Sequence, residues 1–536
     1  MFNKEYKTNN FSASSMVKAS GIVALIGVVS KLLGFVRETV IAAVFGATGI
    51  TDSYLIAYML PSVLFASIGA AIVTVFIPVY TEVNNREGSQ AGFALINKFG
   101  TAALLLVGVL VLMGEIFAPA VVRVLAPGFS GSTFDLTVSL TRLLTPVMVL
   151  LTLSYLATAS LNAQRKFTVP AAIGLPYNII IIGATLLLGR TFGIFGLAIG
   201  TILAVASQFF IQLPSLYKSG YRMRLKLDFA DPNLRKIGLL LGPVIFSSAA
   251  TQINVMVDRI LASGLAEGSI AALNFANRVN LLPFGLFVSS IITVMYPSLS
   301  EYVATDNMPA FTGHLGKVLG IIAFLTFPIT VGFITLAYPM IQILFQRGAF
   351  DASATYATAI ALMYYAIGIA PMALSQMLKR GFWAMQDTKT PMYNSFIAVG
   401  SNIIFNLILV RWMGHGGLAL GTSLAAIVST VVLFWHMRRK VTFSPTLWTS
   451  LAKITVNTGL MAVYCHWAWN VVASNWLLAH TGLLNLILAV GGVVITSAAL
   501  YFLGAYLLKI DEMLWSLNLL NKVMAKLKIK FHPSGA

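Results

Sequence analysis

Long apolar runs separated by short polar breaks dominate this chain of 536 residues. A run of about 20 apolar residues is long enough to cross a bilayer as a helix, and reading such runs predicts about fourteen spans. Their centres fall near residues 33, 66, 105, 148, 179, 204, 248, 286, 323, 368, 402, 427, 460 and 495. Because fourteen is even, both ends of the chain are predicted on one side of the membrane.

Basic residues alternate between the predicted loops. With the N-terminus inside, most Lys and Arg fall in predicted cytoplasmic loops, including the cluster from Lys218 to Lys236. The predicted outer loops hold little beyond Arg123, Arg190, Arg347 and Arg411. Cytoplasmic loops of membrane proteins are enriched in Lys and Arg. The alternation therefore favours fourteen spans with both termini in the cytoplasm.

The chain also contains an internal repeat. The sequence Gly-Leu-Ala-Ile-Gly-Thr at Gly196–Thr201 recurs as Gly-Leu-Ala-Leu-Gly-Thr at Gly417–Thr422, an offset of 221 residues (417 minus 196). Further pairs follow in order at similar offsets, among them Pro61 with Pro283, Pro78 with Pro297 and Gln164 with Gln386. An offset of six spans preserves the direction of insertion. The sequence therefore predicts an all-α polytopic membrane protein with two six-helix lobes in parallel repeat and two extra C-terminal helices.

The repeat suggests a division of the chain. The predicted parts are a cytoplasmic tail (1–16), an N-lobe of helices 1–6 (17–218), a cytoplasmic linker (219–232), a C-lobe of helices 7–12 (233–440), the two extra helices (449–509) and a basic cytoplasmic tail (510–536). The last tail alternates apolar residues with lysines, which fits either an amphipathic segment on the anionic inner leaflet or a solvated tail.

Composition restricts the class of protein. The chain is 58% hydrophobic and 10% charged, with a mean hydropathy of +0.86, which excludes an ordinary soluble domain. The net charge of +18 is explained by basic residues beside membrane spans, so no nucleic-acid partner is expected. A single cysteine, Cys465, excludes an intramolecular disulfide. The histidines are scattered and the sequence has no Walker loop, so neither an enzyme nor an ATP site is predicted. No cofactor is expected apart from the sodium ion considered below.

Several cations lie inside predicted spans. Lys31, Arg37 and Glu38 fall within the apolar segment 21–46, and Arg278 lies in the eighth span. A charge at the centre of a span costs roughly 2.5 to 3.5 kcal/mol on insertion scales, so it usually faces a bundle interior or a wet cavity. We interpret Lys31, Arg37 and Arg278 as lining a cationic cavity that attracts an anionic group such as a pyrophosphate.

An alternative is that these charges hold helices together. Arg37 would then pair with Glu38 or Asp52, and Arg259 with Asp258. Lys31 and Arg37 are six residues apart, about 240° around a straight helix, so lining one cavity would be helped by a bend at Gly34.

A second group of polar residues suggests a cation site. Asn402 and Asn406 are four residues apart, hence on one helix face, and together with Asp258 and Thr422 they offer oxygen atoms of the kind that bind sodium. The alternative is a hydrogen-bond cluster between helices.

Several motifs together resemble one family, MurJ (MviN), the bacterial lipid II flippases of the multidrug/oligosaccharidyl-lipid/polysaccharide exporter superfamily. The motifs span nearly the whole chain and lie at Lys31–Glu38, Phe45–Ala47, Thr51–Asp52, Phe76–Pro78, Ala126–Phe129, Ala276–Arg278 and Gln386–Pro391.

The resemblance implies functional roles for individual residues. Arg37 matches the family's essential first-helix arginine, Asp52 its second-helix aspartate and Arg278 its eighth-helix arginine. Lys31 stands where many members have arginine, Phe65 where many have a further arginine, and Asn277 where an aspartate is common. Residues beside these positions are expected to support the site: Ser30, Gly34, Glu38 and Asn277. Asp258, Asn402, Asn406 and Thr422 fall on the family's sodium site.

The resemblance also implies a function. The cargo would be lipid II, an undecaprenyl-pyrophosphate carrying the peptidoglycan building block, moved to the outer leaflet of the bacterial cytoplasmic membrane by alternating access. The last two spans would form a groove for the lipid tail, with membrane lipids and the cell-wall synthesis machinery as partners. Three alternatives remain open: a flippase for another polyprenyl-pyrophosphate-linked saccharide, a cation-coupled drug antiporter, which would need an acidic cavity, and a membrane scaffold without transport.

Overall fold

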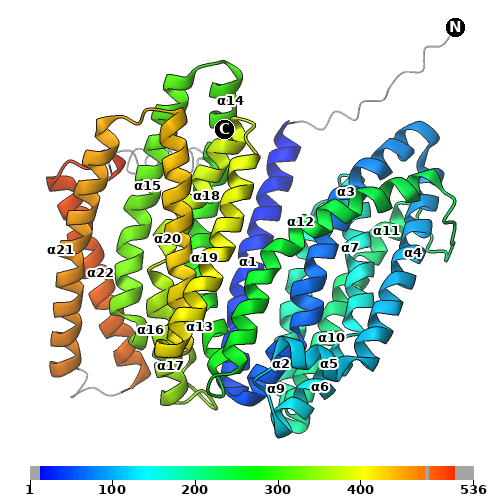
Figure 1. The fold of residues 1–536 in the computed structure, drawn as a ribbon, viewed down its shortest axis with the longest axis horizontal. Helices are drawn as coiled ribbons and strands as arrows, with labels where there is room; N and C mark the ends of the chain where they lie inside the picture. The colour runs from blue at the N-terminus through cyan, green and yellow to red at the C-terminus, as the bar shows by residue number, and fades with distance from the viewer. Residues whose placement is uncertain (1–12, 477–481, 514–536) are drawn as a thin grey trace, which may run out of the picture. The chain divides into compact units, whose positions relative to one another are not determined.

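The computed structural model describes residues 13–476 and 482–513, and in this part of the chain every regular element is a helix (Figure 1). The prediction of an all-α chain is confirmed. Residues 1–12 of the predicted N-terminal tail and 514–536 of the predicted C-terminal tail lie outside the described residues.

The chain forms two compact units. Unit 1 holds residues 1–268 and 347–350, and unit 2 holds residues 269–346 and 351–536. The helices of unit 1 are α1 (Ala13–Phe45), α2 (Gly49–Ala57), η1 (Leu60–Leu64), α3 (Phe65–Glu87), α4 (Ser89–Ile116), α5 (Ala118–Leu125), α6 (Gly131–Leu144), α7 (Val147–Ala163), α8 (Thr168–Ala172), α9 (Gly174–Phe192), α10 (Ile194–Phe210), α11 (Leu213–Lys218) and α12 (Pro232–Ser263). Those of unit 2 are α13 (Ser269–Pro283), η2 (Phe284–Val288), α14 (Ser289–Ala304), α15 (Met308–Thr335), α16 (Ala337–Phe345), α17 (Ala352–Ala366), α18 (Ile369–Ala384), α19 (Lys389–Met413), α20 (His415–Lys440), α21 (Pro445–Asn475) and α22 (Leu483–Leu507). The division into lobes follows the repeat rather than contacts, and it stays a prediction.

The predicted span centres coincide with helices. Thirteen of the fourteen fall inside a helix, and the one near residue 368 falls at the 41° bend between α17 and α18. Among the described residues, eight helices are long and apolar enough to cross a membrane, or nine if α17 and α18 form one span. The number of fourteen spans stays a prediction.

The internal repeat is confirmed by backbone geometry within each unit. Gly193 and Gly414, 221 residues apart, precede α10 and α20 with nearly the same dihedrals (φ 55°, ψ −139° and φ 55°, ψ −132°). Arg165 and Gln386, also 221 apart, both have positive φ, at 60° and 58°. The structure therefore pairs Gln386 with Arg165, one residue away from the expected Gln164.

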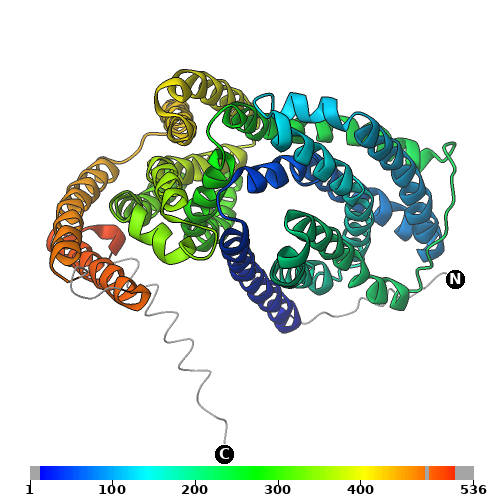
Figure 2. The ribbon, with the colours of Figure 1, turned by 90° about the horizontal axis from the view of Figure 1, so that it is seen from below.

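Each unit has its own apolar core. In unit 1, α3, α4 and α7 pack together, with the buried ring of Phe76 stacked on Phe99 at 5.3 Å between centroids. In unit 2, α15, α18 and α20 pack around Phe311, Phe382 and Leu433. The helices α21 and α22 pack against each other and against α15 (Figure 2). These cores fix the helices that carry the polar groups described next.

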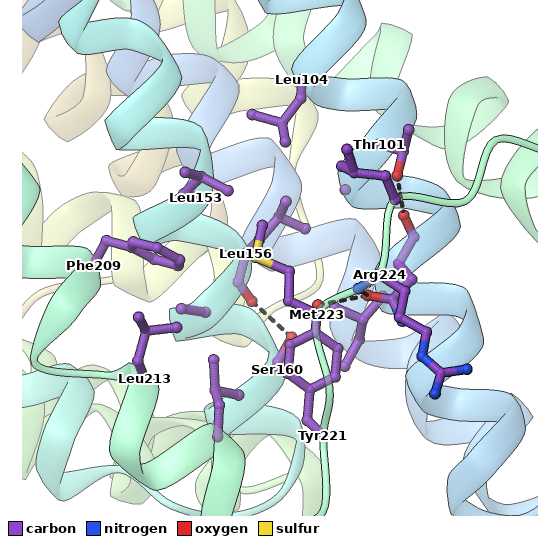
Figure 3. A pocket seen from close by; sticks show the side chains of 16 residues that line it. Thr101, Leu104, Leu153, Leu156, Ser160, Phe209, Leu213, Tyr221, Met223 and Arg224 are labelled. Atoms are coloured by element: carbon purple, nitrogen blue, oxygen red, sulfur yellow. Dashed lines mark hydrogen bonds between the residues drawn. The ribbon is translucent and has the colours of Figure 1, made fainter.

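The linker before α12 runs extended along α4. The Asn97 amide donates to the Arg222 carbonyl (3.1 Å) and accepts from the Tyr221 hydroxyl (2.8 Å), while the backbone N–H of Lys226 donates to Thr101 Oγ1 (3.0 Å). Tyr221 and Met223 close a small apolar cavity of about 30 Å³, and the guanidinium of Arg224 points away from it (Figure 3). Lys98 pairs with Asp231, which caps α12.

Candidate functional site

Arg37 lies in unit 1 among polar side chains of α1 and α9, next to α2. Its guanidinium donates to Glu38 Oε1 at 2.5 Å and to Asn178 Oδ1 at 3.1 Å, and it stacks over the Tyr177 ring at 5.4 Å. Only 15% of the Arg37 side chain and 7% of the Glu38 side chain are exposed. The ion pair expected under the alternative interpretation is therefore present, and it holds a buried guanidinium in place.

Tyrosines continue this group of polar side chains towards α10. The hydroxyls of Tyr58 and Tyr177 lie 3.0 Å apart, Tyr54 stacks on Tyr58 at 5.8 Å, and the Tyr54 hydroxyl lies 2.8 Å from Thr201 Oγ1. Together with Arg37 these residues form a connected network, which we call the Arg37 network. Buried polar groups in a membrane protein need such partners because hydrocarbon offers none.

Asn178 joins α9 to α1. Its amide donates to the carbonyls of Ser30 (3.1 Å) and Gly174 (2.8 Å) while its oxygen accepts from Arg37. A Cβ atom at Gly174 would collide with the Ser30 hydroxyl, so glycine is what lets the two helices approach here. Ser30 thus packs beside Gly174 and Asn178, and its role in the site stays a prediction. The helix α1 continues without a break through Gly34, and Lys31 on it is exposed.

Asp52 has a partner in the turn that follows α12. It is 2% exposed, and its Oδ2 accepts a 2.7 Å hydrogen bond from the backbone N–H of Gly268. Gly268 has a φ of +85°, and a Cβ there would collide with the Ala47 carbonyl. The carboxylate therefore fixes the turn that follows α12. A role for Asp52 in binding substrate stays a prediction.

Arg278 and Asn277 lie in unit 2, on α13, and both are exposed. The next two residues, Val279 and Asn280, are buried, so Arg278 lies on the exposed face of α13. Exposure leaves Arg278 accessible to a ligand, and its assignment to substrate binding stays a prediction.

Three of the four predicted sodium ligands lie together in unit 2. Asn406 Nδ2 donates to Asn402 Oδ1 (3.1 Å), and Asn402 Nδ2 donates to Thr422 Oγ1 (3.3 Å). Both asparagines are buried, at 0% and 1% exposure. The hydrogen-bond cluster of the alternative interpretation is therefore present. Asp258 belongs to α12 of unit 1, and the sodium site stays a prediction.

An apolar pocket of about 320 Å³ lies among α15, α16, α21 and α22 in unit 2. Its walls include Phe324, Phe333, Met461, Val494 and Phe502. We call it the apolar pocket; its lining suits hydrocarbon, as the predicted groove for a lipid tail requires.

Sequence reasoning missed the tyrosines and Asn178 of the Arg37 network. A signal existed, because Tyr54 and Tyr58 are four residues apart in an apolar span and Asn178 is an amide within another. Their link to Arg37 depends on the packing of α2 and α9 against α1, which no local pattern specifies.

Comparison with known proteins identifies relatives along nearly the whole chain. The family model described as lipid II flippase MurJ matches residues 41–487. A probable lipid II flippase MurJ of Vibrio cholerae is 30% identical over 522 residues, covering 92% of this chain and 97% of the relative. A lipid II flippase MurJ of Burkholderia cenocepacia is 29% identical, covering 91% and 96%.

Solved structures agree. A lipid II flippase MurJ in an inward closed conformation superposes with a TM-score of 0.75 at 27% identity, covering 90% of this chain and 98% of that one. An inward-facing multidrug resistance MATE family transporter of the MOP superfamily gives a TM-score of 0.65 at 12% identity, covering 78% and 97%. The second match indicates a shared fold alone.

Proposed function

Because the chain belongs to the MurJ family of lipid II flippases, we propose that it moves lipid II from the inner to the outer leaflet of the bacterial cytoplasmic membrane by alternating access. It is a multi-pass membrane protein, and its cargo is a membrane lipid. The observation that carries the proposal is the family match over residues 41–487, together with relatives that align with about nine tenths of the chain.

The pyrophosphate would bind at the cationic residues Lys31, Arg37 and Arg278. A guanidinium has five N–H donors, so Arg37 can hold Asn178 and Glu38 and still donate to a phosphate oxygen. Glu38 offsets the charge of Arg37 before substrate arrives and lowers the cost of keeping the cation in a span.

The polyprenyl tail would occupy the apolar pocket. Its size, about 320 Å³, accommodates part of a hydrocarbon chain, and aromatic and aliphatic side chains line it. Gly332 on α15 lies in the wall, with open space where its Cβ would stand.

Further features of the proposal concern orientation and energy. Both termini would lie in the cytoplasm, as the distribution of Lys and Arg favours. The chain would catalyse no covalent step, and it would hand lipid II to the cell-wall synthesis machinery outside. A membrane potential, negative inside, favours outward movement of an anion by about 2.3 kcal/mol per charge per 100 mV.

Sodium would help to reset the inward-open state. Asn402, Asn406 and Thr422, which share one hydrogen-bond chain, would hold the ion together with Asp258. Asp258→Ala is expected to remove the sodium response of transport. If transport and its response to sodium were unchanged in this variant, the sodium site should be abandoned.

The test of the proposed function is complementation of a flippase-depleted bacterium, with the leaflet location of lipid II as the readout. The wild-type chain should restore lipid II in the outer leaflet, and Arg37→Ala and Arg278→Ala should fail while still inserting. The matched control is Arg190→Ala, an exposed arginine at the end of α9 that should behave as wild type. A wild-type chain that inserts but leaves lipid II inside would contradict lipid II as cargo and favour another polyprenyl-linked saccharide.

A further inference from the structure

A second, polar pocket of about 590 Å³ lies in unit 2, away from the apolar pocket. The start of α15, the end of α20, the start of α21 and the turn after α22 enclose it. Its polar lining includes Lys317, Lys440, Ser444, Asp511 and Glu512. We call it the polar pocket. None of these residues belongs to the proposed route of lipid II.

Charges of both signs line the polar pocket. Lys440 Nζ lies 2.6 Å from Asp387 Oδ2, and the buried carboxylate of Glu512 accepts a hydrogen bond from the Ser450 hydroxyl. Lys317 and Asp511 are exposed to the pocket region. A simple anion would meet two carboxylates here, and a simple cation would meet two ammonium groups. The lining therefore fits a ligand that carries both charges.

A metal ion fits this lining poorly. Lysines repel a cation, and among the described residues no group of three or more His, Cys, Asp or Glu side chains could hold one. A zwitterionic ligand would place its anionic group near the lysines and the serine and threonine hydroxyls at the start of α21, and its cationic group near Asp511 and Glu512.

The polar pocket lies at the ends of two helices that are long and apolar enough to cross a membrane, since α15 begins at Met308 and α20 ends at Lys440. The ends of such helices are expected at the depth of lipid headgroups. Beside it, Arg438 stacks over the ring of Trp448 at 5.6 Å, and 44% of Trp448 is exposed. Exposed tryptophan and arginine are typical of the membrane–water interface.

We propose that the polar pocket binds the headgroup of an aminophospholipid from the surrounding membrane. Such a headgroup carries a phosphate diester and a primary ammonium, and its glycerol end would lie against the apolar lining at Met308, Val441 and Leu447. The bound lipid is distinct from the cargo, so the proposal does not depend on which lipid the protein transports.

The test uses the purified full-length protein and native mass spectrometry with three phospholipids of identical acyl chains. Phosphatidylethanolamine should bind about fivefold more tightly than phosphatidylcholine, whose quaternary ammonium lacks N–H donors for the carboxylates. It should likewise bind more tightly than phosphatidylglycerol, which has no cationic group. Equal binding of all three lipids to the wild-type protein would overturn the proposal without any variant.

Two variants test which side chain binds the phosphate of the headgroup and which binds its ammonium group. Lys317→Gln should weaken the binding of phosphatidylethanolamine and of phosphatidylglycerol by about threefold each, because the phosphate of both lipids loses a partner. Asp511→Asn should weaken the binding of phosphatidylethanolamine and leave the binding of phosphatidylglycerol unchanged. The matched controls, Lys389→Gln and Glu301→Gln, change exposed residues outside the pocket and should have no effect.

Two outcomes would count against the pocket or its occupant. If the controls changed binding as much as the pocket variants, the lipid would be held by general surface charge. If soluble glycerophosphoethanolamine displaced the lipid at equal concentration, the occupant would be a small molecule rather than a membrane lipid. The melting temperature of each variant, expected to be unchanged, separates lost binding from lost folding.

Discussion

Arg37 is a cation inside a membrane-spanning helix, and its neighbours explain how the helix tolerates it. Glu38 supplies the opposite charge, Asn178 an acceptor and Tyr177 an aromatic face. Of these residues, Asn178 is the one that also links helices, because its amide donates to the carbonyls of Ser30 on α1 and Gly174 on α9.

Asn178→Ala should therefore loosen α9 from α1 and release Arg37. We expect a loss of about 1 to 2 kcal/mol of stability, since hydrogen bonds between helices in membranes contribute roughly 0.6 kcal/mol each. Transport should fall further than this loss explains, because Arg37 loses its orientation. Thermal unfolding in detergent and the lipid II leaflet assay measure the two effects. Transport at the wild-type level in a stably folded variant would contradict a positioning role for Asn178.

Asp52 offers a test between a structural and a binding role. Asp52→Asn keeps an acceptor for the Gly268 N–H but loses the charge, whereas Asp52→Ala loses both. If Asp52 serves mainly to fix the turn, Asp52→Asn should retain most transport. Asp52→Ala should then lose about 1 to 3 kcal/mol of stability, which lowers the melting temperature by several degrees. An Asn variant that folds normally and yet cannot transport would show that the charge itself is needed.

The interactions of Asp387, in the turn before α19, should make the stability of the protein depend on pH. Burial alone raises the pKa of this carboxyl, but hydrogen bonds from Lys440 and Thr390 outweigh it and lower the pKa to about 2 from an ordinary 3.8. A depressed pKa contributes stability above pH of about 4 that is lost as pH falls towards 2. Because Lys440 is partly exposed, we expect about 1 kcal/mol. The melting temperature of Asp387→Asn should lie below wild type at pH 6, by less at pH 3, and approach it near pH 2. A constant difference would contradict this.

Single residues also show which contacts could be predicted from the sequence and which could not. The pairing of Arg37 with Glu38 could be expected because they are adjacent in an apolar run. The bond from Gly268 to Asp52 could not, because its donor is a backbone N–H 216 positions away and leaves no mark in the side-chain pattern. Helix periodicity placed Asn402 and Asn406 on one face, and Thr422 was added because it is near in sequence. The hydrogen bonds among the three depend on the packing of α19 on α20, which the sequence does not specify, and the binding of sodium there stays a prediction.

Among the elements, the helices were the most predictable and their ends the least. Apolar length alone located the long helices, because a chain that crosses hydrocarbon as a single segment has to satisfy its backbone within a helix. The shorter helices, such as α5 and α16, hold none of the predicted span centres. The π-helical turns η1, which contains Pro61, and η2, which follows Pro283, interrupt two predicted spans. The extended linker was expected only as a basic connection, because its fit along α4 depends on Asn97 and Thr101, which are unremarkable in sequence.

The linker gives an element-scale prediction. Asn97→Ala removes the bonds to Arg222, Tyr221 and Arg224, so the linker should open more often. Trypsin, which cuts after Arg and Lys, should then cleave at Arg222, Arg224 or Lys226 about tenfold faster, as a loss of about 1.4 kcal/mol in local stability implies. Asn470→Ala, on the exposed face of α21, is the control. Equal cleavage rates in both variants would mean that Asn97 does not hold the linker.

At the scale of the whole molecule, membrane orientation can be tested with a single-thiol protein. In a Cys465→Ser background, Arg190→Cys and Arg411→Cys should react with a membrane-impermeant maleimide on intact cells, and Lys218→Cys should react only after lysis. This outcome follows from fourteen spans with the N-terminus inside. Labelling of position 218 on intact cells would contradict the span count or the orientation. All three positions are exposed.

The matched turns at Gly193 and Gly414, and at Arg165 and Gln386, bear on the origin of the chain. Backbone dihedrals agree at the same offset although Arg and Gln differ in charge and neither is the residue best suited to positive φ. Conformation has thus outlasted side-chain identity, as expected if an ancestral gene for one half was duplicated and fused. Fusion leaves each half free to change on its own, so Arg37 and Glu38 of the first repeat now stand where the second has Asp258 and Arg259. A single chain can therefore carry different charges at matching positions of its two repeats, which two identical chains cannot.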